Sequence, residues 1–310
     1  MKLVKIILFY LMVTVSAFAG TDDQNQQLRE AAETGNTEKL SALIKQKVDI
    51  HSSDKFGKTA LMYAAEEGKT ESVIVLLSHG ANVNARTKYG STPLIFAAEN
   101  GHSAVTAMLV ELGANVHDRT REGWNSLMIA SKNGDDIIVA QLLEFGADVR
   151  SSDRKGNSSL MYAIDAGHPK VVQTLFQYSD LVAPCLPNKN GMTPIMATID
   201  KKQNDIFNLL LPITKNLDFA DKYGATAIHY AAESNNLSAL EALVKHQVNI
   251  NIQDVDGSTP LMSAVEAGHA DAISFLLANG AKKDLKDLKE KTAQQIAQEK
   301  GKEEIISLLK

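Results

Sequence analysis

The chain has 310 residues, of which 44% are hydrophobic, 22% charged and 5% aromatic, a composition typical of a folded protein and unlike that of disordered or collagen-like chains. A formal net charge of -5 argues against binding to nucleic-acid backbones, which depends on clustered lysine and arginine. The single cysteine excludes an intramolecular disulfide, a four-cysteine zinc site and a Cys-x-x-Cys redox pair.

Residues 1–19 have the pattern of an export signal. Lys2 and Lys5 precede an apolar run at 6–15, and Ala17 and Ala19 form an Ala-x-Ala cleavage pattern. The apolar run is shorter than the roughly 20 residues of a membrane-spanning helix, which predicts cleavage and no membrane insertion afterwards. We therefore expect a mature domain of residues 20–310 in the periplasm or, alternatively, outside the cell.

A glycine recurs along the rest of the chain at intervals of 33 residues, with one interval of 35. Each is followed by Thr-Pro-Leu or a related sequence. Glycine supplies the positive φ of a turn, Thr or Ser caps a helix, and Pro at the first helical position loses no hydrogen bond. The recurring glycines are Gly57, Gly90, Gly123, Gly156, Gly191, Gly224 and Gly257.

Two short helices are predicted after each of these turns. The first contains small residues such as Ala64 and Ala65, where a neighbouring helix must come close, and it ends near a second glycine such as Gly68. The second helix carries an apolar pair such as Leu76 and Leu77. A unit of this size cannot bury its own apolar faces, so adjacent units must share a core.

This pattern resembles the ankyrin repeat. The resemblance implies an all-α solenoid of helix-turn-helix units with β-hairpin or turn fingers, about nine repeats including caps, and it favours one elongated domain over the two compact ones that the length also permits. The implied boundaries are an N-terminal cap at 22–53, repeats at 54–86, 87–119, 120–152, 153–187, 188–220, 221–253 and 254–286, and a C-terminal cap at 287–310.

The sequence contains none of the motifs that would indicate catalysis or a metal site, so we expect no enzyme activity, no cofactor and no bound metal. His102, His168 and His269 recur at the start of second helices, which indicates a structural role. One position of the first helix is occupied by His229 in one unit and by methionine or isoleucine in the others. We interpret this column as core packing, since methionine fills irregular gaps. Its other members are Met62, Ile95, Met128, Met161, Met196 and Met262.

Two rows of charge run along the repeats. Lysine or arginine stands two residues before the turn glycine in six successive units, and an acidic residue usually stands at the end of the first helix. These rows either keep the protein soluble or orient a folded partner. The basic row is Lys55, Lys88, Arg121, Arg154, Lys189 and Lys222, followed by Val255 and Leu288; the other row is Glu66, Glu99, Lys132, Asp165, Asp200, Glu233, Glu266 and Glu299.

The resemblance implies that finger tips and first helices line a concave face on which partners are held. Several finger residues are aromatic or large, and we expect them to face outward and to anchor an interface, because Tyr, Trp and Arg are the usual anchors. Packing on the adjacent finger is the alternative for the single tryptophan. The predicted partner-binding residues are Phe56, Tyr89, Arg121, Trp124, Arg154, Lys189, Met192 and Tyr223.

The junction of the fourth and fifth units is irregular. Its interval is 35 residues, Ser179 replaces the expected glycine, and Cys185 lies between Pro184 and Pro187. A tolerated loop insertion, a bend and a protruding finger all remain open. The thiol is expected either to be buried between the two prolines or to be available for pairing with another molecule.

The expected function is binding of a co-exported folded protein by a chain that is a monomer when free. The resemblance extends to exported bacterial ankyrin proteins, which include inhibitors that protect a cell from its own wall hydrolases. We therefore expect an inhibitor or immunity protein of a periplasmic peptidase or cell-wall hydrolase. The alternatives are a secreted effector directed at host proteins and a stress-protective partner of an oxidoreductase.

Overall fold

The computed structural model describes residues 21–178 and 186–310, so the predicted export signal and Cys185 lie outside the described residues. The chain divides into two compact units between Asp148 and Val149. Within the described residues every regular element is a helix, and only isolated antiparallel bridges occur in the fingers, as between Ser53 and Thr59. The all-α ankyrin-type solenoid is thus confirmed, with fingers that are turns without strands.

The first unit holds an N-terminal helix pair and three finger-helix-helix repeats. The pair is α2 (Asp22–Thr34) and α3 (Thr37–Lys45). First helices α4, α6 and α8 pack on one another in series, and so do the second helices. The elements are α4 (Ala60–Glu66), α5 (Thr70–Ser78), α6 (Pro93–Glu99), α7 (Ser103–Glu111), α8 (Ser126–Asn133) and α9 (Asp136–Glu144).

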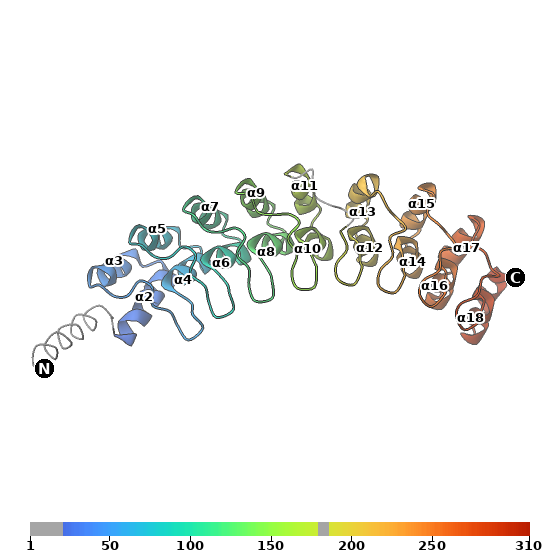
Figure 1. Ribbon diagram of the computed structural model, residues 1–310, viewed down its shortest axis with the longest axis horizontal. Coiled ribbons are helices and arrows are strands. Elements are labelled where there is room, and N and C mark those ends of the chain that lie inside the picture. Colours follow the sequence, from blue (N-terminus) through green and yellow to red (C-terminus); the bar gives the residue numbers. More distant parts are fainter. Residues whose placement is uncertain (1–20, 179–185) are drawn as a thin grey trace, which may run out of the picture. The chain divides into compact units, whose positions relative to one another are not determined.

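The second unit continues the pattern, with its first helices in one layer and its second helices in another (Figure 1). Its fingers extend from the first-helix layer, away from the second helices. The elements are α10 (Ser159–Ala166), α11 (Pro169–Gln177), α12 (Pro194–Asp200), α13 (Asn204–Leu210), the 3-10 turn η1 (Leu211–Ile213), α14 (Ala227–Glu233), α15 (Leu237–Lys245), α16 (Pro260–Ala267), α17 (Ala270–Ala278), α18 (Ala293–Glu299) and α19 (Glu303–Leu309).

Each first helix begins where the sequence pattern predicts, at a Thr, Ser or Asn cap. Thr92 Oγ1 accepts a hydrogen bond from the Ile95 N–H at 3.3 Å, and Pro93 follows at the first helical position. The methionine column adds a second contact, because the Thr59 N–H donates to Sδ of Met62 at 3.4 Å. The column is therefore buried core, as predicted, and in several repeats it also helps to cap the helix.

The core of each unit lies between its two helix layers. Alanines of the first helices, such as Ala64 and Ala97, are fully buried where successive first helices touch, and leucines of the second helices, such as Leu76 and Leu109, fill the space between the layers. Small side chains permit the close approach of neighbouring helices. Every repeat therefore depends on its neighbours for its buried surface.

One repeat of the second unit departs from the regular form. Pro212 ends α13 after seven residues, and the chain continues as η1. Lys202 takes the left-handed conformation, with a φ of 54°, that glycine takes in most other repeats and Asn235 takes in the α14 repeat. Despite this irregularity, α13 still packs against α12, α11 and α15.

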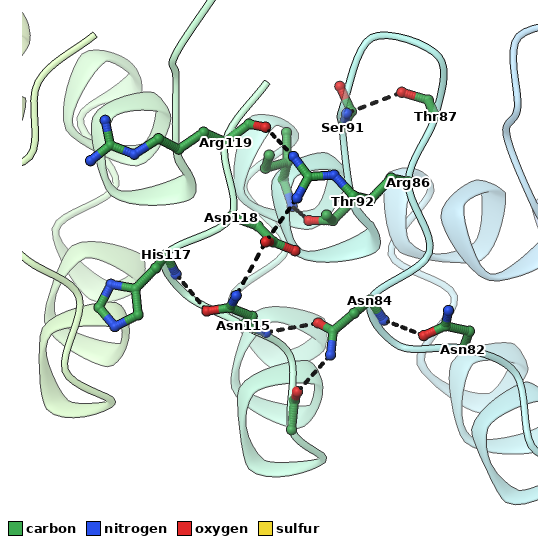
Figure 2. A network of polar contacts seen from close by, with 12 residues as sticks. Asn82, Asn84, Arg86, Thr87, Ser91, Thr92, Asn115, His117, Asp118 and Arg119 are labelled. Carbon is green, nitrogen blue, oxygen red and sulfur yellow. Dashed lines mark hydrogen bonds and ion pairs between the residues drawn. The ribbon is translucent and has the colours of Figure 1, made fainter. Parts of the chain in front are cut away.

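The loops after the second helices are joined by side-chain amides (Figure 2). Asn84 accepts a hydrogen bond from the Asn115 N–H at 2.8 Å and donates to the Gly113 carbonyl at 3.1 Å. In the second unit Asn251 makes the equivalent bonds, from the Lys282 N–H at 2.8 Å and to the Gly280 carbonyl at 3.2 Å. These asparagines connect the backbones of successive repeats on the side of the second helices.

Candidate binding surface

The fingers are rigid because their turns are closed by side-chain and backbone hydrogen bonds. We name each finger by the first helix that it precedes. In the α4 finger, Asp54 Oδ1 accepts from the N–H groups of Phe56 and Lys58, both at 2.8 Å, and its Oδ2 accepts from the Tyr63 hydroxyl at 3.1 Å. The α10 and α14 fingers repeat this tyrosine contact, from Tyr162 to Asp153 at 2.7 Å and from Tyr230 to Asp221 at 2.9 Å.

These contacts shift the ionisation of the groups involved. Partial burial raises the pKa of Asp54, but the hydrogen bonds from Lys58, Phe56 and Tyr63 outweigh it and hold that pKa below its ordinary value. Burial raises the pKa of the Tyr162 and Tyr230 hydroxyls, and the hydrogen bonds to Asp153 and Asp221 raise it further. The tyrosine hydroxyls therefore remain protonated donors near neutral pH and tie the fingers to their first helices.

Neighbouring fingers are joined backbone to backbone. In the first unit the Lys88 N–H donates to the Phe56 carbonyl at 2.9 Å, and the Arg121 N–H donates to the Tyr89 carbonyl at 2.8 Å. In the second unit Lys189, Lys222, Val255 and Leu288 make the same bond to the finger before them. This approach explains a turn glycine: a Cβ on Gly224, whose φ is +79°, would lie 2.7 Å from the Val255 nitrogen.

Three predicted anchors are exposed at the finger tips, immediately before the turn glycine. Phe56 and Tyr89 of the first unit are 47% and 55% exposed, and Tyr223 of the second unit is 60% exposed. The Lys55 ammonium lies 5.0 Å from the centroid of the Phe56 ring, and that of Lys222 lies 4.7 Å from the Tyr223 ring. The tips at Phe56 and Tyr223 thus each present an aromatic ring with a cation over it.

The other predicted basic residues stand two positions before the turn glycine of their own fingers. Arg121 in the first unit and Arg154 and Lys189 in the second are exposed. The backbones of Arg121 and Lys189 are held by hydrogen bonds to the finger before them. Each unit therefore carries a basic edge of its own along its finger tips.

Trp124 and Met192 do not face outward in the way the sequence analysis expects. Both follow the turn glycine and are half-buried. The chain reverses at the glycine, so the residue after it points toward the first helices, as shown by the Lys132 ammonium 5.2 Å from the Trp124 ring. Met192 lines a groove of about 260 Å³ with Tyr162 and Lys201. These two side chains form the base of the surface and not its tip.

The row at the ends of the first helices is mostly paired within the protein. Glu66 bonds to Lys58 and Glu299 to Lys291, and Lys201 lies within 3.4 Å of both Asp165 and Asp200. The hydrogen bond to Asp165 and the charges of both aspartates raise the pKa of Lys201. Lys132 interrupts the row and covers Trp124. Among the described residues, only Glu99, Glu233 and Glu266 of this row have no hydrogen bond or ion pair to their carboxylates.

We call the finger tips and the adjoining sides of the first helices the finger face. The sequence alone did not reveal the role of the residue after the turn, which in the α4 and α18 repeats is a lysine that pairs with the helix-end glutamate. The column Lys58, Ser91, Trp124, Asn157, Met192, Ala225, Ser258 and Lys291 could have revealed it, because it mixes long cations with small residues.

Within residues 21–178 and 186–310 no group of three or more His, Cys, Asp or Glu side chains is arranged to hold a metal ion. No helix in the same part of the chain is both long and apolar enough to cross a bilayer. His102 Nε2 lies 2.8 Å from the Glu66 carbonyl oxygen, which agrees with the structural role expected for the histidines at second-helix starts.

Comparison with known proteins agrees with this architecture. A family model described as ankyrin repeats (3 copies) matches residues 28–120, 112–184, 179–254 and 247–310. Inversin of Danio rerio is 36% identical over 61 residues, which is 19% of this chain and 6% of inversin. The chain therefore corresponds to a small part of that relative's length.

Proposed function

The chain belongs to the ankyrin-repeat family, whose repeats are protein–protein interaction modules, and we propose that its finger face binds one folded, co-exported protein. We further propose that the partner is a periplasmic peptidase or cell-wall hydrolase and that binding inhibits it, so that the chain acts as an immunity protein. The N-terminal pattern of Lys2, Lys5, Ala17 and Ala19 is the support for export.

The observation that carries the binding proposal is the set of exposed rings and cations on rigid fingers. Phe56 and Tyr89 in one unit and Tyr223 in the other are large, exposed and held in place by hydrogen bonds of their own backbone. Exposed aromatic and arginine side chains are typical interface anchors, and an anchor that is already ordered loses little entropy when it binds. Solubility alone does not require an exposed ring at a finger tip.

Inhibition follows if the fingers enter or cover the cleft of the enzyme. Substrate clefts are concave, whereas finger tips project, so the two shapes are complementary. The basic edge beside the tips, which includes Arg121 in the first unit and Arg154 in the second, suits a partner whose cleft is rimmed by carboxylates, and charge complementarity speeds the encounter.

The proposal is tested with the purified chain and its partner enzyme. Stoichiometric addition of the chain should abolish hydrolysis by the enzyme. A Tyr89→Ala, Tyr223→Ala variant should need a concentration at least about tenfold higher than the wild type to reach the same inhibition. An Ile137→Ala variant is the matched control, because Ile137 is exposed on the second helix α9. An unchanged rate would refute inhibition and leave binding intact, and a raised rate would indicate a stress-protective partner. Recovery of the protein from the culture medium would favour a secreted effector.

A further inference from the structure

In two repeats a lysine side chain is bound by a glutamate at the base of the finger. In the α4 and α18 repeats the residue after the turn is a lysine, and its ammonium bonds to the glutamate at the end of the first helix, eight residues later. These pairs are Lys58 with Glu66, and Lys291 with Glu299, the latter at 2.6 Å. The α8 repeat reverses the pattern, since Lys132 at the helix end lies over Trp124.

Two consecutive repeats of the second unit lack this lysine. Ala225 and Ser258 occupy its position, so the glutamates at the ends of α14 and α16, Glu233 and Glu266, have no cation of their own repeat within reach. Both glutamates are exposed, and neither carboxylate has a hydrogen bond or ion pair among the described residues. The position at which the α4 and α18 repeats place an ammonium is therefore not filled by a lysine of these two repeats.

The missing lysines open a groove of about 510 Å³ between the α14, α16 and α18 repeats, with Ala225 and Ser258 in its wall. Asp254 and Asp287 also line it, but their Oδ1 atoms accept hydrogen bonds from the N–H groups of their own fingers. The groove is acidic overall, because it contains five carboxylates and only two lysines. Its charged residues are Glu233, Asp254, Asp256, Glu266, Asp287, Lys289 and Lys300.

Among the described residues, neither Lys289 nor Lys300 forms an ion pair with these carboxylates. The Lys300 ammonium donates to the backbone carbonyl of Glu266 at 3.2 Å, and no ion pair joins it to a carboxylate in the described part of the chain. Asp256 is exposed on the finger, and its side chain is likewise without a bond among the described residues. Three carboxylates, those of Glu233, Asp256 and Glu266, therefore line one groove without an ion pair among the described residues.

Beside this groove, the finger position that is basic in six other repeats is apolar: Leu288 lines the groove, and Val255 stands between the lining residues Asp254 and Asp256. Val255 and Leu288 occupy the position two residues before the turn, and they are 56% and 75% exposed. Six preceding fingers have lysine or arginine at this position. The change removes the cations that would repel a positively charged ligand and supplies two exposed apolar side chains in their place.

We propose that this groove receives a lysine or arginine of the partner protein, flanked by apolar residues, with the cation on Glu233 and Glu266 and the apolar flanks on Val255 and Leu288. The proposal rests on the finger face being the binding surface. The partner's cation would occupy the position that Lys58 and Lys291 occupy in their own repeats. Charge complementarity and the apolar rim together select a basic and apolar segment over an acidic or purely polar one.

Fluorescence anisotropy with the full chain tests the proposal directly. The probe is a fluorescein-labelled dodecapeptide that contains two lysines flanked by leucines in a Gly-Ser background. Matched peptides replace the lysines by glutamate or by norleucine. We expect the basic peptide to bind and the glutamate and norleucine peptides to bind at least about tenfold more weakly. Equal binding of the basic and norleucine peptides would overturn the assignment of a cation site.

Two double variants locate the site. Glu233→Gln with Glu266→Gln removes the charge and keeps the shape, and Ala225→Lys with Ser258→Lys supplies the lysines that the α4 and α18 repeats have at this position. Each double variant should weaken the binding of the basic peptide by about tenfold or more. Glu99→Gln is the matched control, because Glu99 is also unpaired at a helix end but lies in the first unit, and this variant should bind normally. Wild-type binding by both double variants would refute the proposal.

The same variants separate this inference from the proposed function. One outcome is that the glutamine double variant still inhibits the partner enzyme while the Tyr89→Ala, Tyr223→Ala variant does not. That result would refute the groove as a partner-binding site and support the finger face as the binding surface. If the groove binds the basic peptide but neither variant alters partner binding, the groove is supported and the proposed function fails.

Discussion

Replacing His229 by methionine is expected to remove a pH dependence of stability. His229 is buried, its Nδ1 lies 3.1 Å from the Thr226 N–H, and its Nε2 lies 3.1 Å from the Ser258 carbonyl oxygen. Nδ1 therefore accepts and Nε2 carries the proton in the neutral ring. Burial lowers the pKa of His229 below its ordinary value of 6.5, and a second proton would also lie against the Thr226 N–H.

The sign of the effect follows from linkage. The unfolded chain binds a proton at this residue as the pH falls below 6.5, whereas the folded chain does not until its lower pKa is reached. The contribution of the neutral ring to the stability of the folded chain is therefore complete above pH 6.5. It is lost as the pH falls from 6.5 toward the lower pKa of the folded state. The slope of the loss is at most about 1.4 kcal/mol per pH unit.

Methionine is the matched replacement because the same column uses it elsewhere. Met196 and Met262 accept the cap N–H at 3.4 Å with their sulfur atoms. The variant loses the bond to the Ser258 carbonyl, which still accepts from the Asp254 N–H at 3.0 Å, so the cost is about 1 kcal/mol at pH 7.5.

Chemical denaturation of both proteins between pH 7.5 and 5 measures the difference in unfolding free energy, in which the contributions of the other titrating groups cancel. The wild type should be more stable at pH 7.5 and should lose this advantage below pH 6.5. A difference that does not change with pH would refute the assigned tautomer and the buried neutral state.

Three further predictions concern the fingers and the interface. Glu290→Gly should stabilise the C-terminal repeat by about 1 kcal/mol, measured by denaturation, because Glu290 has a φ of 61°; a loss of stability would contradict this. Asp153→Ala should cost at least about 2 kcal/mol, because three hydrogen-bond donors lose their acceptor, and Asp153→Asn should cost less; equal costs would contradict this account of the finger turn. Trp124→Ala with Tyr89→Ala should weaken partner binding in calorimetry by about 2 kcal/mol or more, with Ile137→Ala as control, and wild-type affinity would place the interface elsewhere.

The repeat architecture was predictable because each local signal recurs at one period. Gly224, its Thr226 cap and the buried Ile228 obey rules that apply residue by residue, and Glu290 could be identified as a turn residue from the period alone. Backbone conformation at these positions depends mainly on the residue itself and its neighbours in sequence.

The direction of finger side chains was not predictable in the same way. The sequence pattern predicts that both Tyr89 and Trp124 face outward, although Tyr89 precedes the turn glycine of its finger and Trp124 follows that of the next finger. The pairing of Glu66 with Lys58 and the absence of a partner for Glu233 depend on a contact over eight residues. Such contacts require the three-dimensional path of the finger against its helix.

Site-specific photo-crosslinking is the most direct test of the finger face as the binding surface. Benzoylphenylalanine would be placed at Tyr89 and Tyr223 on the fingers, or at Ile74 and Ile137, which are exposed on second helices. The full chain would be produced and irradiated in its source organism. We predict one protein adduct, shared by the two finger positions and absent from the two second-helix positions. An adduct at Ile74 or Ile137 without one at Tyr89 and Tyr223 would contradict the account.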